Sequence, residues 1–63
     1  MLRTINNHKY QEPISFYTED ITELDSERIV APAVGDDTGN SYCAIFGKHE
    51  AGSYFLKDFE LEQ

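Results

Sequence analysis

The chain has 63 residues, 40% of them hydrophobic, and its 12 Asp and Glu against 5 Lys and Arg give a formal charge of −7. Four Phe and four Tyr make it too apolar for a disordered segment, and the negative field disfavours direct binding to nucleic acid or membrane. The single cysteine, Cys43, excludes an internal disulfide, and no apolar run is long enough for a signal peptide, so we expect a cytoplasmic protein.

Residues 1–12 carry isolated apolar side chains among polar ones and predict no regular element, with a turn favoured at the central Asn-Asn pair. Residues 14–18 are rich in β-branched and aromatic side chains. They predict a first strand, in which Ile14 and Phe16 share one face.

A short helix is predicted after this strand. Thr18 precedes two acids, as a helix cap does, and Ile21 and Leu24 have the i, i+3 spacing of a narrow apolar stripe. A helix of one or two turns is marginal alone, so both apolar side chains should pack on the sheet.

Residues 28–61 alternate three apolar segments with two polar, glycine-bearing turns at 36–40 and 50–53. This pattern predicts a three-stranded antiparallel meander. The last strand begins at Tyr54 and should end in a single tight turn at residues 57–59.

The first two strands of the meander are apolar on both faces. In the segment 28–34, Pro32 cannot donate to a ladder, so this strand should be a sheet edge or have its pairing interrupted by a bulge. The segment 41–48 should be central and covered on both sides. Periodicity alone does not choose the core face of either strand.

Together these elements predict a single domain over residues 1–63 that is mainly β. We expect an antiparallel meander of three to five short strands, with residues 1–12 irregular. The arrangement is similar either to an SH3-like small barrel or to an open sheet with one short helix, a small α+β fold.

Few side chains offer a foothold for catalysis or for metal binding. Cys43 and His49 lie across a strand end with no basic neighbour, which favours a buried structural cysteine over a nucleophile. His8 and His49 lack the close spacing of zinc ligands. The oxygen-bearing side chains of 36–40 match a calcium loop incompletely and fit a hairpin turn better. We therefore expect no enzyme, no catalytic residue, no metal and no cofactor.

The most distinctive surface feature is a run of five acids within residues 19–27, with no base before Arg28. We expect the protein to act by binding another protein, as an interaction or regulatory module, and to form a homodimer through edges or apolar faces. The expected contact residues are this acidic run and the predicted edge, namely Glu19, Asp20, Glu23, Asp25, Glu27, Val30 and Pro32.

The alternative is a nucleic-acid mimic that inhibits a nucleic-acid-binding protein through its acidic face. Side chains two apart on an extended strand lie about 6.5–7 Å from each other, close to the spacing of successive phosphates. Glu23, Asp25 and Glu27, or Glu60 and Glu62, have that separation in sequence. The competing interpretation of the same residues is a solvated face that serves solubility.

Overall fold

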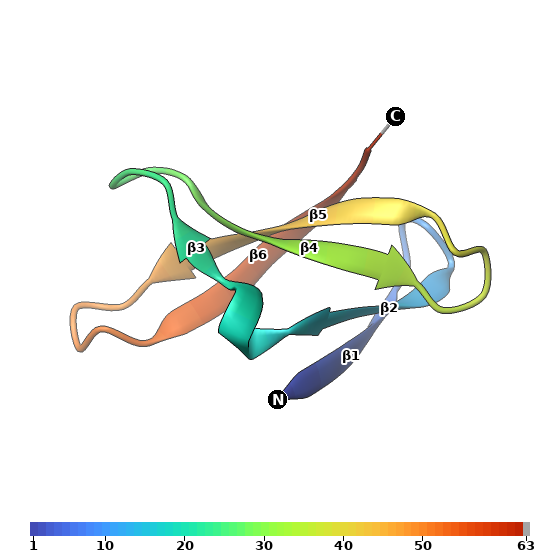
Figure 1. The fold of residues 1–63 in the computed structure, drawn as a ribbon, viewed down its shortest axis with the longest axis horizontal. Coiled ribbons are helices and arrows are strands. Elements are labelled where there is room, and N and C mark those ends of the chain that lie inside the picture. Colours follow the sequence, from blue (N-terminus) through green and yellow to red (C-terminus); the bar gives the residue numbers. More distant parts are fainter. Residues whose placement is uncertain (63) are drawn as a thin grey trace.

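The computed structural model describes residues 1–62, which form a curled antiparallel sheet (Figure 1). Its strand order is β1-β2-β4-β5-β6, and β3 pairs with β4 beside this path. The elements are β1 (Leu2–Asn7), β2 (Glu12–Tyr17), the 3-10 turn η1 (Thr18–Asp20), β3 (Thr22–Glu23), β4 (Ile29–Gly35), β5 (Ser41–Lys48) and β6 (Tyr54–Leu61).

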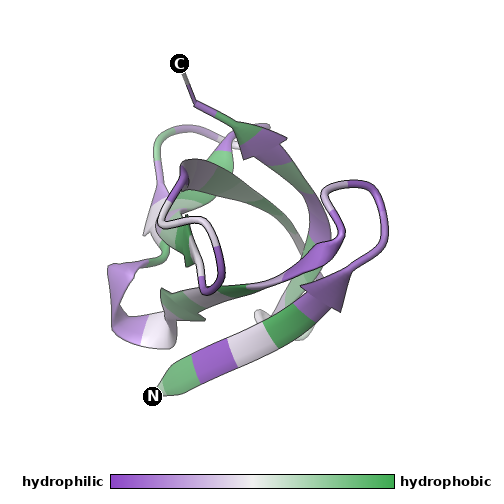
Figure 2. Ribbon diagram, turned by 90° about the vertical axis from the view of Figure 1, so that its right-hand side faces the viewer, coloured by the Kyte–Doolittle hydropathy of each residue, from purple (hydrophilic) through white to green (hydrophobic). Residues whose placement is uncertain are grey.

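The predictions of a mainly β fold and of an antiparallel meander are confirmed. Seen from its end, the sheet curls into a half-barrel, with β1 and β6 as its two edges (Figure 2). Within residues 1–62, no helix has the length and apolar composition needed to cross a membrane.

The core lies on the inner face of the curl. Alternation along β4 and β5 turns every second side chain inward, which settles the core face that the sequence left open. The ring of Phe16 lies 5.3 Å from that of Phe46 and 6.2 Å from that of Phe59, in edge and tilted geometries. The buried residues are Ile14, Phe16, Ile29, Ala31, Ala33, Tyr42, Ala44, Phe46 and Phe59.

The first segment of the chain is more regular than its composition predicts. Leu2–Asn7 pairs along its whole length with β2, and the turn is confined to residues 8–11. Ile5 lies opposite Ile14 and packs against the core, while the Thr4 and Ser15 hydroxyls are hydrogen-bonded at 2.8 Å. Cross-strand contacts of this kind stabilise an edge strand whose exposed residues give no apolar periodicity.

The predicted helix is wrong beyond one turn. Only Thr18–Asp20 is helical, as a 3-10 turn without a side-chain cap, and residues 22–23 form β3 instead. Ile21 packs against the core as expected, but Leu24 is 56% exposed. Pairing of β3 with β4 satisfies backbone groups that a second helical turn would leave in water.

Pro32 does not mark an edge, because β4 has neighbours on both sides. On one side it pairs with β5, and on the other it pairs first with β3 and then with β2. On that second side, β4 pairs with β2 at Val34 and Gly35 and with β3 at Ile29 and Val30. The Gly35 amide donates toward the β5 side, so by alternation the position of Pro32 faces the gap between β2 and β3. The missing N–H therefore falls where no partner strand needs it.

The predicted tight turn at 57–59 is also wrong, because β6 continues to Leu61. The register slips by one residue between Ile45 and Phe46, which leaves Lys57 as the extra residue of a β-bulge. This bulge lets Leu56 and Phe59 both contact the core although they are three residues apart. Residues 57–59, which indicated a turn in the sequence, instead continue β6 and include the extra residue of the bulge.

Phe46→Ala should lower the free energy of unfolding by about 3–5 kcal/mol, because the Phe46 ring is buried against Phe16 in the centre of the core. Urea titration followed by circular dichroism measures the loss. Val34→Ala, on the exposed side of β4, is the matched control and should cost about 0.5 kcal/mol or less. A loss under about 1 kcal/mol for Phe46→Ala would remove this ring from the core.

Gly52→Val should destabilise the β5–β6 turn, because Gly52 has a φ of 97°, which a β-branched residue adopts only under strain. No atom obstructs a side chain there, so the cost would be conformational. Gly52→Asn should cost less in the same urea titration, because Asn tolerates positive φ better than Val does. Equal stability of the native chain and Gly52→Val would indicate a different turn.

Candidate functional site

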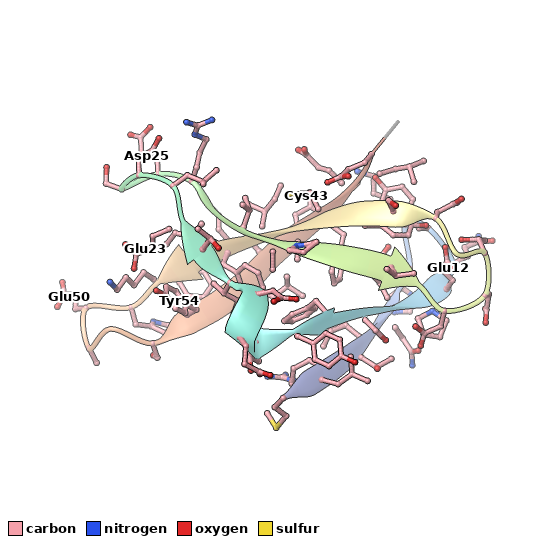
Figure 3. All side chains as sticks on the ribbon, viewed as in Figure 1. Glu12, Glu23, Asp25, Cys43, Glu50 and Tyr54 are labelled. Atoms are coloured by element: carbon pink, nitrogen blue, oxygen red, sulfur yellow. The ribbon has the colours of Figure 1, made fainter. Side chains whose placement is uncertain are left out.

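The best-connected polar group of the described residues is the Glu12 carboxylate, at the start of β2. It is only 5% exposed and accepts hydrogen bonds from the backbone amides of Asp37 and Thr38 at 3.1 and 3.0 Å. The hydroxyls of Thr38 and Tyr42 donate to its second oxygen at 2.8 and 2.5 Å. Figure 3 shows Glu12 beside the β4–β5 turn, which these bonds fasten to β2.

These contacts hold Glu12 ionised and leave room for nothing else. The Tyr42 hydroxyl is the main cause that lowers the pKa of Glu12, with the Thr38 hydroxyl and two amides adding to it against the opposing effect of burial. The same bond raises the pKa of Tyr42. A side chain at Gly35 would collide with the Glu12 carboxylate, so glycine is required there. Every strong acceptor site is used internally, which makes this a structural group.

The acidic run 19–27 is largely engaged in contacts within the chain. Glu19 pairs with the N-terminal ammonium, and Glu23 accepts from Lys48 and Tyr54 at 2.8 and 2.7 Å. Lys48 is the main cause that lowers the pKa of Glu23. Asp25 accepts from the amides of residues 27 and 28 and from the Arg28 side chain. Asp20 and Glu27 are exposed.

The geometry that motivated the phosphate-mimic hypothesis is wrong for this run. β3 ends at Glu23, and Asp25 closes a turn over residues 24–28, so Glu23, Asp25 and Glu27 do not follow one extended strand. The separation of about 7 Å between side chains two residues apart applies only to an extended chain. The structure thus brings no regular row of carboxylates together here.

The two remaining predicted contact residues, Val30 and Pro32, lie on the outer face of the half-barrel. They belong to an apolar group on β4 and β5 whose members all point away from the core. This outer stripe consists of Val30, Pro32, Val34, Cys43 and Ile45. Val30 lies opposite Ile45, and Pro32 lies opposite Cys43, so the members adjoin one another across the two strands.

The outer stripe is partly exposed and has acidic neighbours. Val34 is 51% exposed, and at the far end the Phe55 ring lies over Gly47 with 41% of its surface exposed. On β6, Asp58 is the partner of Ile45 and Glu60 the partner of Cys43. The expectation that 41–48 is covered on both sides is therefore only half right, because the outer side of β5 has no covering layer among the described residues.

Cys43 lies at the centre of the outer stripe and is partly exposed. Burial raises the pKa of its thiol, with Glu62 and Glu60 adding to the effect. A thiol held in its protonated form is a poor nucleophile. The expected burial of Cys43 is wrong, because its position in β5 turns it to the outer face of the sheet, where it is partly exposed.

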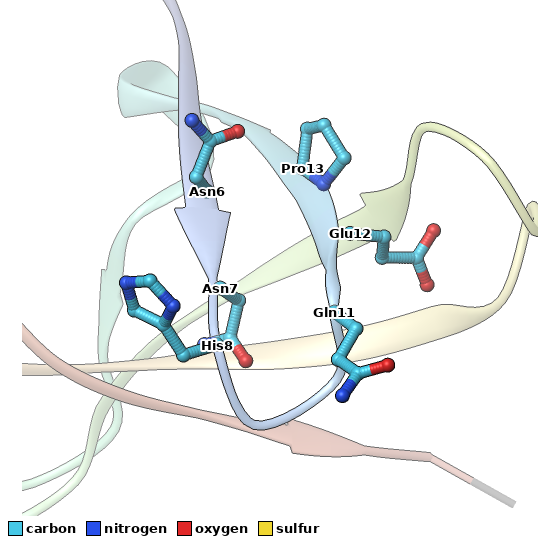
Figure 4. A pocket seen from close by; sticks show the side chains of 6 residues that line it. All are labelled: Asn6, Asn7, His8, Gln11, Glu12 and Pro13. Atoms are coloured by element: carbon cyan, nitrogen blue, oxygen red, sulfur yellow. The ribbon is translucent and has the colours of Figure 1, made fainter.

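A hollow of about 380 Å³ lies at the β1–β2 turn, and most of its lining residues have polar side chains (Figure 4). It is lined by Asn6, Asn7, His8, Gln11, Glu12 and Pro13. Figure 4 shows Glu12 pointing away from His8 toward the β4–β5 turn, so the one carboxylate of this hollow is already occupied. In residues 1–62, no three His, Cys, Asp or Glu side chains are grouped so that they could hold a metal ion.

Comparisons of the chain with protein-family models, with curated proteins and with solved structures each found no match. The fold places the chain in the class of small antiparallel half-barrels. The features that bear on its function are the surfaces of this half-barrel.

Sequence reasoning located Val30 and Pro32 but missed their neighbours Val34, Cys43 and Ile45. The sequence contained a signal for this surface, because the segments 28–34 and 41–48 both carry apolar side chains on each of their two faces. Two adjacent strands with two apolar faces predict an exposed apolar surface whenever only one layer covers the sheet.

Glu12→Gln should lower the free energy of unfolding at neutral pH and should make this free energy depend less on pH. The folded carboxyl has a lowered pKa, so its contribution is present above the usual value of 4.5 and is lost as pH falls through the folded pKa. Urea titrations between about pH 7 and about pH 3 should show the native chain and the variant converging at the acid end. Glu50→Gln, on the exposed β5–β6 turn, is the control. A constant gap between native chain and Glu12→Gln at all pH values would contradict this role.

Proposed function

We propose that the protein is a small binding module that docks on another protein through the outer stripe. The observation that carries this proposal is the continuous apolar surface of Val30, Pro32, Val34, Cys43 and Ile45, which lies outside the core and is partly exposed. Contiguous apolar surface on a small soluble fold is a mark of interaction sites. The module supplies no catalytic group in this proposal, and the partner takes its place over β4 and β5.

The charges around the outer stripe specify the partner's chemistry. Asp58 and Glu60 adjoin it directly on β6, and the whole chain carries a formal charge of −7. A partner with an apolar surface flanked by Lys or Arg would pair with these acids and approach faster by electrostatic steering. The exposed acids Asp20 and Glu27, from the predicted contact set, extend the acidic surroundings beyond β3.

A second copy of the chain is a less favourable partner for this face. Two copies in a symmetric contact would bring like charges together at Asp58 and Glu60, and two convex surfaces meet over a small area. We also infer a cytoplasmic setting, in which the single thiol stays reduced.

Val34→Lys should weaken binding of the basic partner by about tenfold or more, because it puts a positive charge into the apolar contact at the Val34 end of the outer stripe. The native chain and Val34→Lys are immobilised in parallel, proteins retained by the native chain alone are identified, and the best candidate is purified. Its dissociation constant is then measured for both chains by calorimetry at low and high salt. Val34 is exposed, so the variant should fold as the native chain does.

Cys43 provides an independent test, because it is the only thiol of the chain and lies in the proposed contact. Its alkylation rate at a fixed alkaline pH should fall when the purified partner is bound. Glu50→Lys, which changes charge on the distant β5–β6 turn, should leave both binding and protection intact. Unchanged Cys43 alkylation in the complex, or binding that survives Val34→Lys, would overturn the proposal.

A further inference from the structure

The half-barrel has an open mouth at one end, away from the outer stripe. All neighbouring strands are antiparallel, so β1 and β6 run in the same direction and their first residues meet at this end. A groove of about 450 Å³ opens there. Volumes of this size, at the mouths of β-barrels, are typical of sites for small molecules.

The groove is apolar at its base and has a single charge among its lining residues. The T-shaped pair Phe16 and Phe46 forms the floor, and Ile5, Ile21 and Leu56, each half-buried, form the walls. Arg3 lines the groove from β1, and Thr18 and Tyr54 contribute hydroxyls. Of residues 1–62, none that lines the groove has a carboxylate.

Two of the carboxylates close to the mouth are paired within the chain. Glu19 pairs with the N-terminal ammonium, and Glu23 pairs with Lys48. Arg3 forms no ion pair with any residue in the described part of the chain. In a protein of formal charge −7, an apolar groove with a guanidinium as its only charged wall is matched to an anionic head group on an apolar body.

We propose that the mouth binds a small apolar monocarboxylic acid, with its chain over Phe16 and Phe46 and its carboxylate on Arg3. This site shares none of the five residues of the outer stripe and differs from it in chemistry, although Phe55, at the far end of the stripe, is also among the residues that line the groove. The proposal stands or falls independently of the protein-binding proposal. Burial of the apolar body would supply affinity, and the bidentate geometry of a guanidinium would select a carboxylate over a neutral head group.

Octanoate is the probe, and the readout is a methyl NMR titration of the native chain. The methyl groups of Ile5, Ile21 and Leu56 should shift, while those of Val30 and Val34 on the outer stripe should not. Arg3→Gln should weaken octanoate binding by about tenfold, and 1-octanol should bind the native chain about as weakly as octanoate binds the variant. Arg3→Lys keeps the charge and should recover part of the affinity. Lys9→Gln, in the β1–β2 turn at the opposite end of the half-barrel, is the matched control.

Three outcomes would overturn this proposal. Equal shifts at the mouth and at Val30 and Val34 would indicate unspecific adsorption to apolar surface. Equal affinities for octanoate and 1-octanol would remove Arg3 from recognition. Binding of the peptide acetyl-alanyl-leucine without binding of octanoate would assign the mouth to a protein C-terminus instead of a free acid.

Discussion

The fold depends on one buried carboxylate. Glu12 is only 5% exposed, and four donors from the β4–β5 turn and from β5 converge on it, so β2 cannot separate from the meander without leaving a charge unpaired. Breaking such a pairing is much more costly than never having buried the charge. A chain this short buries little apolar surface, and a fully satisfied polar group at the end opposite the mouth supplies specificity that the core alone lacks. This arrangement requires glycine at position 35, because any side chain there would collide with the Glu12 carboxylate.

The half-barrel separates two kinds of apolar surface. The inner face is filled and closed around the Phe16, Phe46 and Phe59 rings, whereas the outer stripe and the mouth each leave apolar side chains in contact with water. Their charges differ in sign, since the stripe adjoins Asp58 and Glu60 and the mouth is lined by Arg3. One small sheet can thus present two surfaces that select opposite ligands.

The parts of the fold that follow from local pattern were predictable from sequence, and the parts set by long-range pairing were not. The three strands of 28–61 and the inward positions of Ile14 and Phe16 follow from alternation and turn residues. β1 could not be predicted, because its order comes from pairing with β2 and its own residues are mostly polar. Residues 57–59 indicated a turn, whereas in the structure they belong to β6, and the bulge among them is set by the pairing of β6 with β5. The role of Glu12 depends on donors 25 to 30 residues away.

The common direction of β1 and β6 also restricts how copies of this chain can join. If the sheet were extended by laying β1 of one molecule against β6 of the next with the inner faces aligned, the two strands would be parallel, because the main path has five strands and both edges point the same way. A parallel ladder is somewhat weaker than an antiparallel one. Antiparallel addition requires β1 to meet β1, or β6 to meet β6, about a two-fold axis. A contact of this kind joins two molecules and does not repeat. An odd number of strands thereby disfavours growth of a fibre from a single repeated contact.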